Sequence, residues 1–194
     1  MHFYTNGKIA WLKIPKNACM SWSKALESMG WWEEDLYIPN TDLSSLEFFA
    51  LIQDPENRHT TGAAQYIRNN ELYSLLDDVN YQSLLVSACF DEHTYTIHST
   101  VPDSIIKRTT WFVMDHVHFD YEKLVKNYLE HRGIDLPAVP RLNQSTAQHK
   151  LLKQKIANLK QQYPEQHAKL TKNFIGADLR LYRTQTLIQS QWDK

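Results

Sequence analysis

The apolar positions of the chain fall into two patterns that alternate along its length. Three short runs are almost continuously apolar, which is typical of strands buried on both faces of a parallel sheet. They occupy residues 9–14, 47–53 and 109–115. After each run, apolar residues recur every three or four positions, as on one face of an amphipathic helix, over residues 22–29, 57–69 and 121–133. Strands that alternate with helices predict an α/β fold with a mainly parallel central sheet flanked by helices.

The rest of the chain is expected to be less regular. Further helices are predicted at residues 71–78, 80–90, 151–159, 165–174 and 177–183. Polar and Pro-containing stretches predict loops or connections at residues 31–46, 91–103 and 134–147. Residues 1–7 are expected to form a hairpin arm or a loose end, and the polar stretch from Thr184 is expected to fray. We therefore predict one domain over residues 1–194.

The composition limits the kinds of partner that the chain can bind. Its formal net charge is −1 over 194 residues, whereas a typical nucleic-acid-binding domain is strongly basic. We therefore expect no nucleic-acid partner. Aromatic residues make up 12% of the chain, and beside the core a few of these rings could line a substrate groove.

Cysteine content and hydropathy bear on the compartment. Cys19 and Cys89 are the only cysteines, so the sequence implies no disulfide framework and fits a reducing compartment. The first residues lack the long apolar segment of a signal peptide. No apolar run approaches the roughly 18 residues of a membrane span. These features predict a cytoplasmic protein without a membrane span.

The stretch of residues 8–26 carries the strongest candidate chemistry. Pro15 ends the first apolar run because it has no N–H to donate to a sheet. Small residues follow, and Ser21 is the expected N-cap of the next helix, which we expect to stop at Gly30. A strand, a short loop and a helix in this order direct several backbone N–H groups at one spot, which attracts phosphate or sulfate. Lys16 lies in the loop and could reach the same anion.

Two alternatives apply to this loop. A lysine in a strand–helix turn also occurs in α/β proteins that bind nothing there. The loop contains no glycine, so it does not match the Gly-x-x-x-x-Gly-Lys-Ser/Thr pattern of nucleoside triphosphatases. A nucleotide kinase or another phosphoryl-transfer enzyme is therefore disfavoured.

The segment Ile14-Pro15-Lys16-Asn17-Ala18 resembles the 5′-phosphosulfate loop of sulfotransferases that use 3′-phosphoadenosine 5′-phosphosulfate (PAPS), in particular the Golgi carbohydrate branch. Residues 54–61, Asp-Pro-Glu-Asn-Arg-His-Thr-Thr, are similar to the Asp-Pro-x-x-Arg-x-x-Ser part of the family's 3′-phosphate motif. Weaker similarities are found at residues 91–102, 111–115, 121–129, 142–145 and 177–182. The resemblance implies a three-layer, P-loop-like sulfotransferase fold.

Two positions depart from the family pattern, and the first departure removes a charge. Gln53 stands where the 3′-phosphate motif has its first arginine, and Thr61 stands where it has serine. Thr61 keeps a hydroxyl, but an amide replaces a cation, and charge-assisted contacts are about twice as strong as neutral ones. Arg58 or a basic residue from the C-terminal part could supply the charge. Otherwise PAPS binds more weakly, the donor differs, or activity has been lost.

The resemblance also implies roles for individual residues. Lys16 would meet the negative charge that develops on the leaving 5′-phosphate. The 3′-phosphate would be held by Arg58 and Thr61. The 5′ end of the donor would be held by Lys16, Asn17, Ala18, Cys19, Met20, Ser21 and Trp22, with Trp22 either stacked on adenine or part of the core.

The general base is expected to be a histidine or a glutamate. The similarity to the carbohydrate branch points to His98, with His93 next. Several branches of the family place a glutamate shortly after the first helix, which points to Glu33 or Glu34. We favour His98, followed by Glu33 and Glu34. The alternatives are a loop histidine bonded to the backbone and a solvated acidic turn. The spacing of the histidines and cysteines matches no zinc pattern, and no metal is expected.

The sequence therefore predicts a sulfotransferase that moves a sulfuryl group from PAPS to a hydroxyl of a glycan or small molecule and releases adenosine 3′,5′-bisphosphate. The departure at Gln53 leaves a second hypothesis open, a sulfotransferase-like protein that binds a ligand without turnover.

Overall fold

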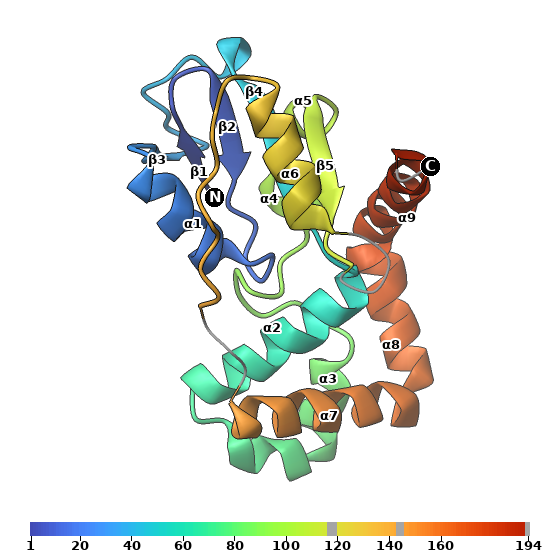
Figure 1. Ribbon diagram of the computed structural model, residues 1–194. Coiled ribbons are helices and arrows are strands. Elements are labelled where there is room, and N and C mark those ends of the chain that lie inside the picture. Colours follow the sequence, from blue (N-terminus) through green and yellow to red (C-terminus); the bar gives the residue numbers. More distant parts are fainter. Residues whose placement is uncertain (116–119, 143–145, 193–194) are drawn as a thin grey trace. The chain divides into compact units, whose positions relative to one another are not determined.

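The chain forms two compact units. The structure, a computed structural model, describes residues 1–115, 120–142 and 146–192 (Figure 1). The first unit contains the described residues of segments 1–53, 98–143 and 182–194, and the second contains those of segments 54–97 and 144–181. The single sulfotransferase-like domain stays a prediction, and residues 143–145 of the family resemblance lie outside the described residues.

The first unit is built on a five-stranded mixed sheet. Its strands are β1 (His2–Thr5), β2 (Ile9–Leu12), β3 (Trp32–Asp35), β4 (Glu47–Ile52) and β5 (Thr109–Val113), in the order β3-β1-β2-β4-β5. Strands β2, β4 and β5 are parallel, whereas β1 is antiparallel to both β2 and β3. The α/β class is confirmed, but the prediction of a mainly parallel sheet is wrong, because two of the four pairings are antiparallel.

The two additional strands have different origins. Residues 1–7 form the hairpin arm that was one of the two expectations: the Asn6 side-chain oxygen accepts hydrogen bonds from the N–H groups of Lys8 and Ile9, and Gly7 takes a φ of 86° in the turn. Strand β3 was expected to be part of a loop. Its backbone pairs with β1, from His2 opposite Asp35 to Thr5 opposite Trp32, and a local pattern does not reveal such a distant partner.

Helix α1 (Cys19–Ser28) follows β2. Its end matches the prediction: Gly30 has a φ of 81°, and the N–H groups of Gly30 and Trp31 donate to the carbonyls of Glu27 and Leu26, as in a Schellman motif. Its start does not match, because the N-cap is Ala18, with no side-chain hydrogen bond, rather than Ser21.

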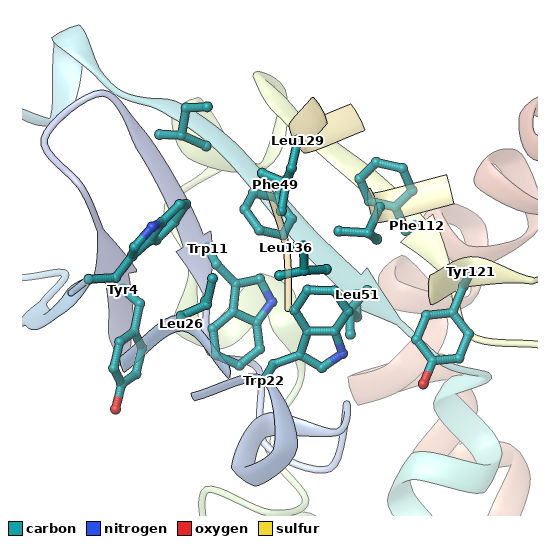
Figure 2. Close-up of a cluster of buried hydrophobic side chains, with 13 residues drawn as sticks. Tyr4, Trp11, Trp22, Leu26, Phe49, Leu51, Phe112, Tyr121, Leu129 and Leu136 are labelled. Carbon is teal, nitrogen blue, oxygen red and sulfur yellow. The ribbon is translucent and has the colours of Figure 1, made fainter. Parts of the chain in front are cut away.

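The core of the first unit lies between one face of the sheet and helices α1 and α6 (Tyr121–Glu130) (Figure 2). Trp11, Trp22 and Phe49 are fully buried at its centre. The ring of Trp22 lies 6.3 Å from that of Trp11 and 6.4 Å from that of Phe49, centroid to centroid. Each such side chain buries about 150–250 Å², so these aromatic rings fix α1, and the loop before it, on the strands.

The other face of the sheet is covered as well. The Trp111 indole donates to the carbonyl of Ile106, the last residue of α5 (Asp103–Ile106). Helix α9 (Gly176–Trp192) belongs to the second unit through residue 181 and to the first from residue 182. Its buried Gln189 side chain accepts from the Val113 N–H at 2.8 Å and donates to the Val113 carbonyl at 3.2 Å. The part of the stretch expected to fray that the structure describes, residues 184–192, is therefore helical, and its Gln189 holds strand β5.

The second unit is helical. It contains α2 (Pro55–Asn69), η2 (Tyr73–Asp77), α3 (Val79–Leu85), α7 (Ala147–Gln162), α8 (Pro164–Leu170) and the π-helical turn η3 (Thr171–Ile175). Ala63, Ala64 and Ile67 of α2, which we expected to face inward, are fully buried and pack with Leu152 and Ile156 of α7. The expected loop at residues 91–103 includes a short helix, α4 (Ile97–Thr100).

Within the described part of the chain, the helices are either too short or too polar to cross a bilayer.

Candidate anion-binding site

The turn between β2 and α1 has an unusual backbone. Lys16 and Ala18 have φ values of 66° and 55°, in the left-handed region, which costs an L-residue about 1–2 kcal/mol. The Asn17 N–H between them donates to the Ile14 carbonyl at 3.1 Å. Non-glycine residues keep such a conformation only where their surroundings impose it, and such residues cluster at binding sites.

Two side-chain amides impose this conformation. The buried Asn17 side chain donates through Nδ2 to the Leu51 carbonyl of β4 at 2.6 Å. Gln53, which follows β4, donates through Nε2 to the Lys16 carbonyl at 2.5 Å. The turn after β2 is therefore tied to the end of the neighbouring parallel strand. At the position of the family's arginine, the Gln53 amide holds the backbone of the lysine loop.

The start of α1 is open to an anion. The first N–H groups of any helix have no partner within the helix. In α1 no side chain of the described residues caps them, and the first turn contains no acidic residue. The exposed Met20 and the half-buried Cys19 lie in this turn. The hydroxyl oxygen of Ser21 accepts the N–H of Leu142 at 3.2 Å, so it holds the 139–142 segment beside the helix instead of capping it.

A pocket of about 580 Å³ lies beside this helix start, within the first unit. The starts of both α1 and α6 border it, and the segment 139–142 closes one side. It is lined by Ala18, Ser21, Trp22, Tyr121, Glu122, Val139, Pro140, Arg141 and Leu142. Its volume is in the range of small-molecule sites, and it lies beyond the carboxyl ends of β2 and β5, where ligands of parallel sheets bind.

The aromatic wall of the pocket has two polar atoms with different surroundings. The indole Nε1 of Trp22 is buried and has no hydrogen-bond partner among the described residues, and it lies on the side of the ring toward Tyr121 (Figure 2). The Tyr121 hydroxyl donates to Glu122 Oε1 at 3.3 Å. Burial, and then the adjacent Glu122, raise the pKa of Tyr121 to about 12, so this hydroxyl keeps its proton at neutral pH.

The predicted bases Glu33 and Glu34 lie on edge strand β3 and do not line the pocket. Glu33 is paired with Lys13 at 2.7 Å. Glu34 is buried and accepts hydrogen bonds from Trp32 Nε1, the Asn40 N–H, and the Thr41 N–H and hydroxyl. Burial alone would raise the pKa of Glu34, but these hydrogen bonds outweigh it and lower the pKa to about 2. A carboxylate stabilised in this way is a weak proton acceptor.

His98, the preferred base of the sequence interpretation, is exposed on α4 and does not line the pocket either. The structure thus brings the start of α1 together with the pocket. It brings none of the three predicted bases to that pocket.

Arg58 and Thr61 lie on α2, in the second unit. The Arg58 guanidinium is only 3% exposed, lies 3.4 Å from the fully buried Asp178 carboxylate, and donates to the Tyr95 carbonyl. The same Asp178 oxygen accepts the Ile97 N–H at 2.7 Å. Arg58 therefore has an internal counter-ion, which sequence reasoning missed. The role of both residues toward a 3′-phosphate stays a prediction.

A second missed cluster surrounds Glu56 in the first turn of α2. Its carboxylate accepts hydrogen bonds from Lys160 Nζ at 2.9 Å, His167 Nε2 at 2.7 Å and the Thr171 hydroxyl at 3.2 Å. Burial raises the pKa of Glu56, but Lys160 and His167 outweigh this effect, and the net pKa is lowered. These partners lie more than 100 residues away in the sequence, so no local pattern could have revealed them.

Among the described residues, no group of three or more His, Cys, Asp or Glu side chains could hold a metal ion. Comparisons with protein-family models, with curated proteins and with solved structures found no match.

Proposed function

We propose that the chain is a sulfotransferase that moves a sulfuryl group from PAPS to a hydroxyl of a glycan or small molecule. The observation that carries the proposal is the uncapped start of α1, next to a lysine loop that Asn17 and Gln53 hold in place. A helix start without its own carboxylate is a ready site for a phosphate or sulfate group. The sequence resemblance of residues 14–18 supplies the identity of the anion.

The chemistry required of this site is mainly electrostatic. The acceptor oxygen attacks sulfur, a new O–S bond forms, and the S–O bond to the 5′-phosphate breaks, so negative charge grows on the departing phosphate. The ammonium of Lys16 and the N–H groups of the first turn of α1 would stabilise that charge. Because the loop is already fixed, little reorganisation is needed when the charge develops.

Binding of adenosine 3′,5′-bisphosphate, the product of the donor, tests the proposal. Ligand at 100 times its dissociation constant should stabilise the folded chain by about 2.7 kcal/mol, which a thermal shift would detect. Lys16→Ala should weaken binding at least tenfold in calorimetry. Lys24→Ala removes an exposed lysine of the same helix and should bind like wild type. Absence of binding by the wild-type chain at millimolar ligand contradicts the proposal.

A second candidate function is ligand binding without turnover. It is favoured by Gln53, whose amide is engaged with the Lys16 carbonyl, and by Arg58, which has the internal counter-ion Asp178. Gln53→Arg distinguishes the two functions. A large gain in affinity for adenosine 3′,5′-bisphosphate would indicate a pocket that has lost its cation, as expected for a protein without turnover. Unchanged affinity would mean that another cation already serves, as expected for an enzyme.

A further inference from the structure

The pocket beside the start of α1 contains one acidic side chain among its described lining residues, Glu122. Glu122 is the second residue of α6 and is half-buried. It lines the same cavity as Ala18 and Ser21, which belong to the start of α1. A carboxylate thus borders the space next to the place where the proposed sulfuryl group would bind.

The surroundings of Glu122 differ from those of Glu33 and Glu34, the two glutamates that the sequence interpretation offered as bases. In the described part of the chain its carboxylate makes no ion pair, and it accepts a single long hydrogen bond, 3.3 Å, from the Tyr121 hydroxyl. Glu33 and Glu34, by contrast, are engaged by Lys13 and by four hydrogen-bond donors, respectively. Glu122 therefore has lone pairs available for a ligand, while Tyr121 positions its side chain.

We propose that this pocket binds the acceptor and that Glu122 is the general base of the transfer. The inference rests on the proposed sulfotransferase function. Glu122 takes the proton from the acceptor hydroxyl as the acceptor oxygen bonds to sulfur, and the electron pair of the breaking S–O bond leaves with adenosine 3′,5′-bisphosphate. The protonated Glu122 then releases its proton to water, which restores the carboxylate.

The lining also indicates the chemical class of the acceptor. Val139, Pro140 and Leu142 give the pocket an apolar side, and Ser21 and Arg141 add polar atoms. A volume of about 580 Å³ accommodates a small ring with room for substituents. The acceptor is therefore a hydroxylated ring, which a sugar or a phenol can supply.

Release of adenosine 3′,5′-bisphosphate from PAPS measures the step. N-acetyl-D-glucosamine, D-galactose and 4-nitrophenol serve as acceptors, and water serves as the reference acceptor. Glu122→Gln, which keeps the shape and the Tyr121 hydrogen bond, should lower kcat at least 100-fold, as expected for loss of a general base. Its affinity for adenosine 3′,5′-bisphosphate should stay within twofold of wild type. Glu130→Gln, at the exposed end of the same helix, should turn over like wild type.

Chemical rescue separates a base from a structural residue. Added formate should restore part of the activity of Glu122→Ala but none of that of Lys16→Ala. Wild-type kcat in Glu122→Gln, or no turnover of any acceptor by a wild-type chain that binds adenosine 3′,5′-bisphosphate, overturns the inference. A wild-type chain that does not bind this nucleotide overturns the proposed function itself.

Filling the pocket tests the acceptor site. Leu142→Trp should raise the KM of the ring acceptor at least tenfold and leave the affinity for adenosine 3′,5′-bisphosphate unchanged. Leu151→Trp, at an exposed position of α7 in the second unit, is the matched control. If Leu142→Trp instead weakens nucleotide binding, the pocket holds the nucleotide, and the assignment of the acceptor is wrong.

Discussion

Helices α1 and α2 both start just beyond a parallel strand, but a carboxylate caps the N-terminus of α2 and no side-chain cap is found at that of α1 among the described residues. The N-cap of α2 is Asp54, whose carboxylate accepts the Asn57 N–H at 3.0 Å, and Glu56 lies in the first turn. Helix α1 begins at Ala18, with no side-chain cap and no acidic residue in its first turn. The start of α2 therefore carries two carboxylates of its own, whereas among the described residues the N-cap and first turn of α1 carry none.

This difference separates a structural helix start from one suited to a ligand. A carboxylate near a helix N-terminus contributes about 0.3–1 kcal/mol, and α2 uses its acids in this way while Glu56 also joins α7 and α8. Leaving α1 uncapped gives up that stabilisation, and Ala18 adds backbone strain. An external anion has more to gain at α1, because neither the N-cap nor the first turn of this helix carries a carboxylate that would compete with it.

The largest expected effect concerns the internal ion pair of α2. Asp178→Leu would leave the buried Arg58 guanidinium without its counter-ion and the Ile97 N–H without its acceptor. Breaking one side of a buried pair costs about 3–5 kcal/mol, which urea unfolding would measure. Arg180→Leu, at an exposed position of α9, the helix that carries Asp178, should change the free energy of unfolding by less than about 0.5 kcal/mol. A similarly small loss in Asp178→Leu would mean that Arg58 is not held by this pair.

A smaller loss is expected for Glu56→Gln. Hydrogen bonds to charged groups contribute about 1.5–3 kcal/mol, and the variant weakens those from Lys160, His167 and Thr171. Because folding lowers the pKa of Glu56 from its ordinary 4.5, its contribution is fully present above pH 4.5 and is lost as the pH falls through the folded pKa. Urea unfolding from pH 7 to pH 3 should therefore show the two proteins converging below pH 4.5. A difference in the free energy of unfolding that stays constant over this pH range would contradict the ionic role of Glu56. Glu165→Gln on α8 is the control.

A carboxylate N-cap on α1, like Asp54 on α2, should remove the difference between the two helix starts. Ala18→Asp places a carboxylate at the start of α1, where it would compete with the phosphosulfate group. We expect affinity for adenosine 3′,5′-bisphosphate to fall at least tenfold, about 1.4 kcal/mol, in calorimetry. Ala18→Asn introduces a side chain of nearly the same shape as aspartate but without the charge, and asparagine and aspartate both tolerate the left-handed conformation. The asparagine variant should therefore bind the nucleotide like wild type. Equal weakening by both variants would indicate a steric effect.

The smallest expected effect is the change in the free energy of unfolding when the backbone strain at Ala18 is relieved. Ala18→Gly relieves the φ of 55° and should raise the free energy of unfolding by about 0.5–1 kcal/mol, as glycine does at positive φ. Ala25→Gly, in the interior of α1, should lower it by about 1 kcal/mol or more. If both substitutions destabilised the chain, the turn would not be strained.

Local sequence patterns predicted the elements that depend on local chemistry. The apolar runs predicted β2, β4 and β5, and the helical periodicity predicted α1, α2 and α6. Burial on both faces leaves an apolar run, and burial on one face leaves a helical period, so each can be found in a short window. Strand β3 carries no such pattern, because a short edge strand with exposed charges differs little from a polar loop.

The same distinction holds for the candidate site. Lys16 and the residues that follow it could be named because they are contiguous and stand between a strand and a helix. The tether from Gln53 to the Lys16 carbonyl joins residues 37 positions apart, and the counter-ion of Arg58 is 120 positions away. In the sequence Gln53 could be recognised only as an amide in place of a cation.

Local sequence patterns were enough to predict parallel strands followed by helices and a lysine loop at the first of these junctions. The packing of distant segments, by contrast, sets which charges are already neutralised. It paired Arg58 with Asp178 and brought Lys160 and His167 to Glu56, and it placed Glu122 in a pocket beside the start of α1. The physical reason is that electrostatic pairing depends on distances between side chains, which are set when distant segments pack together.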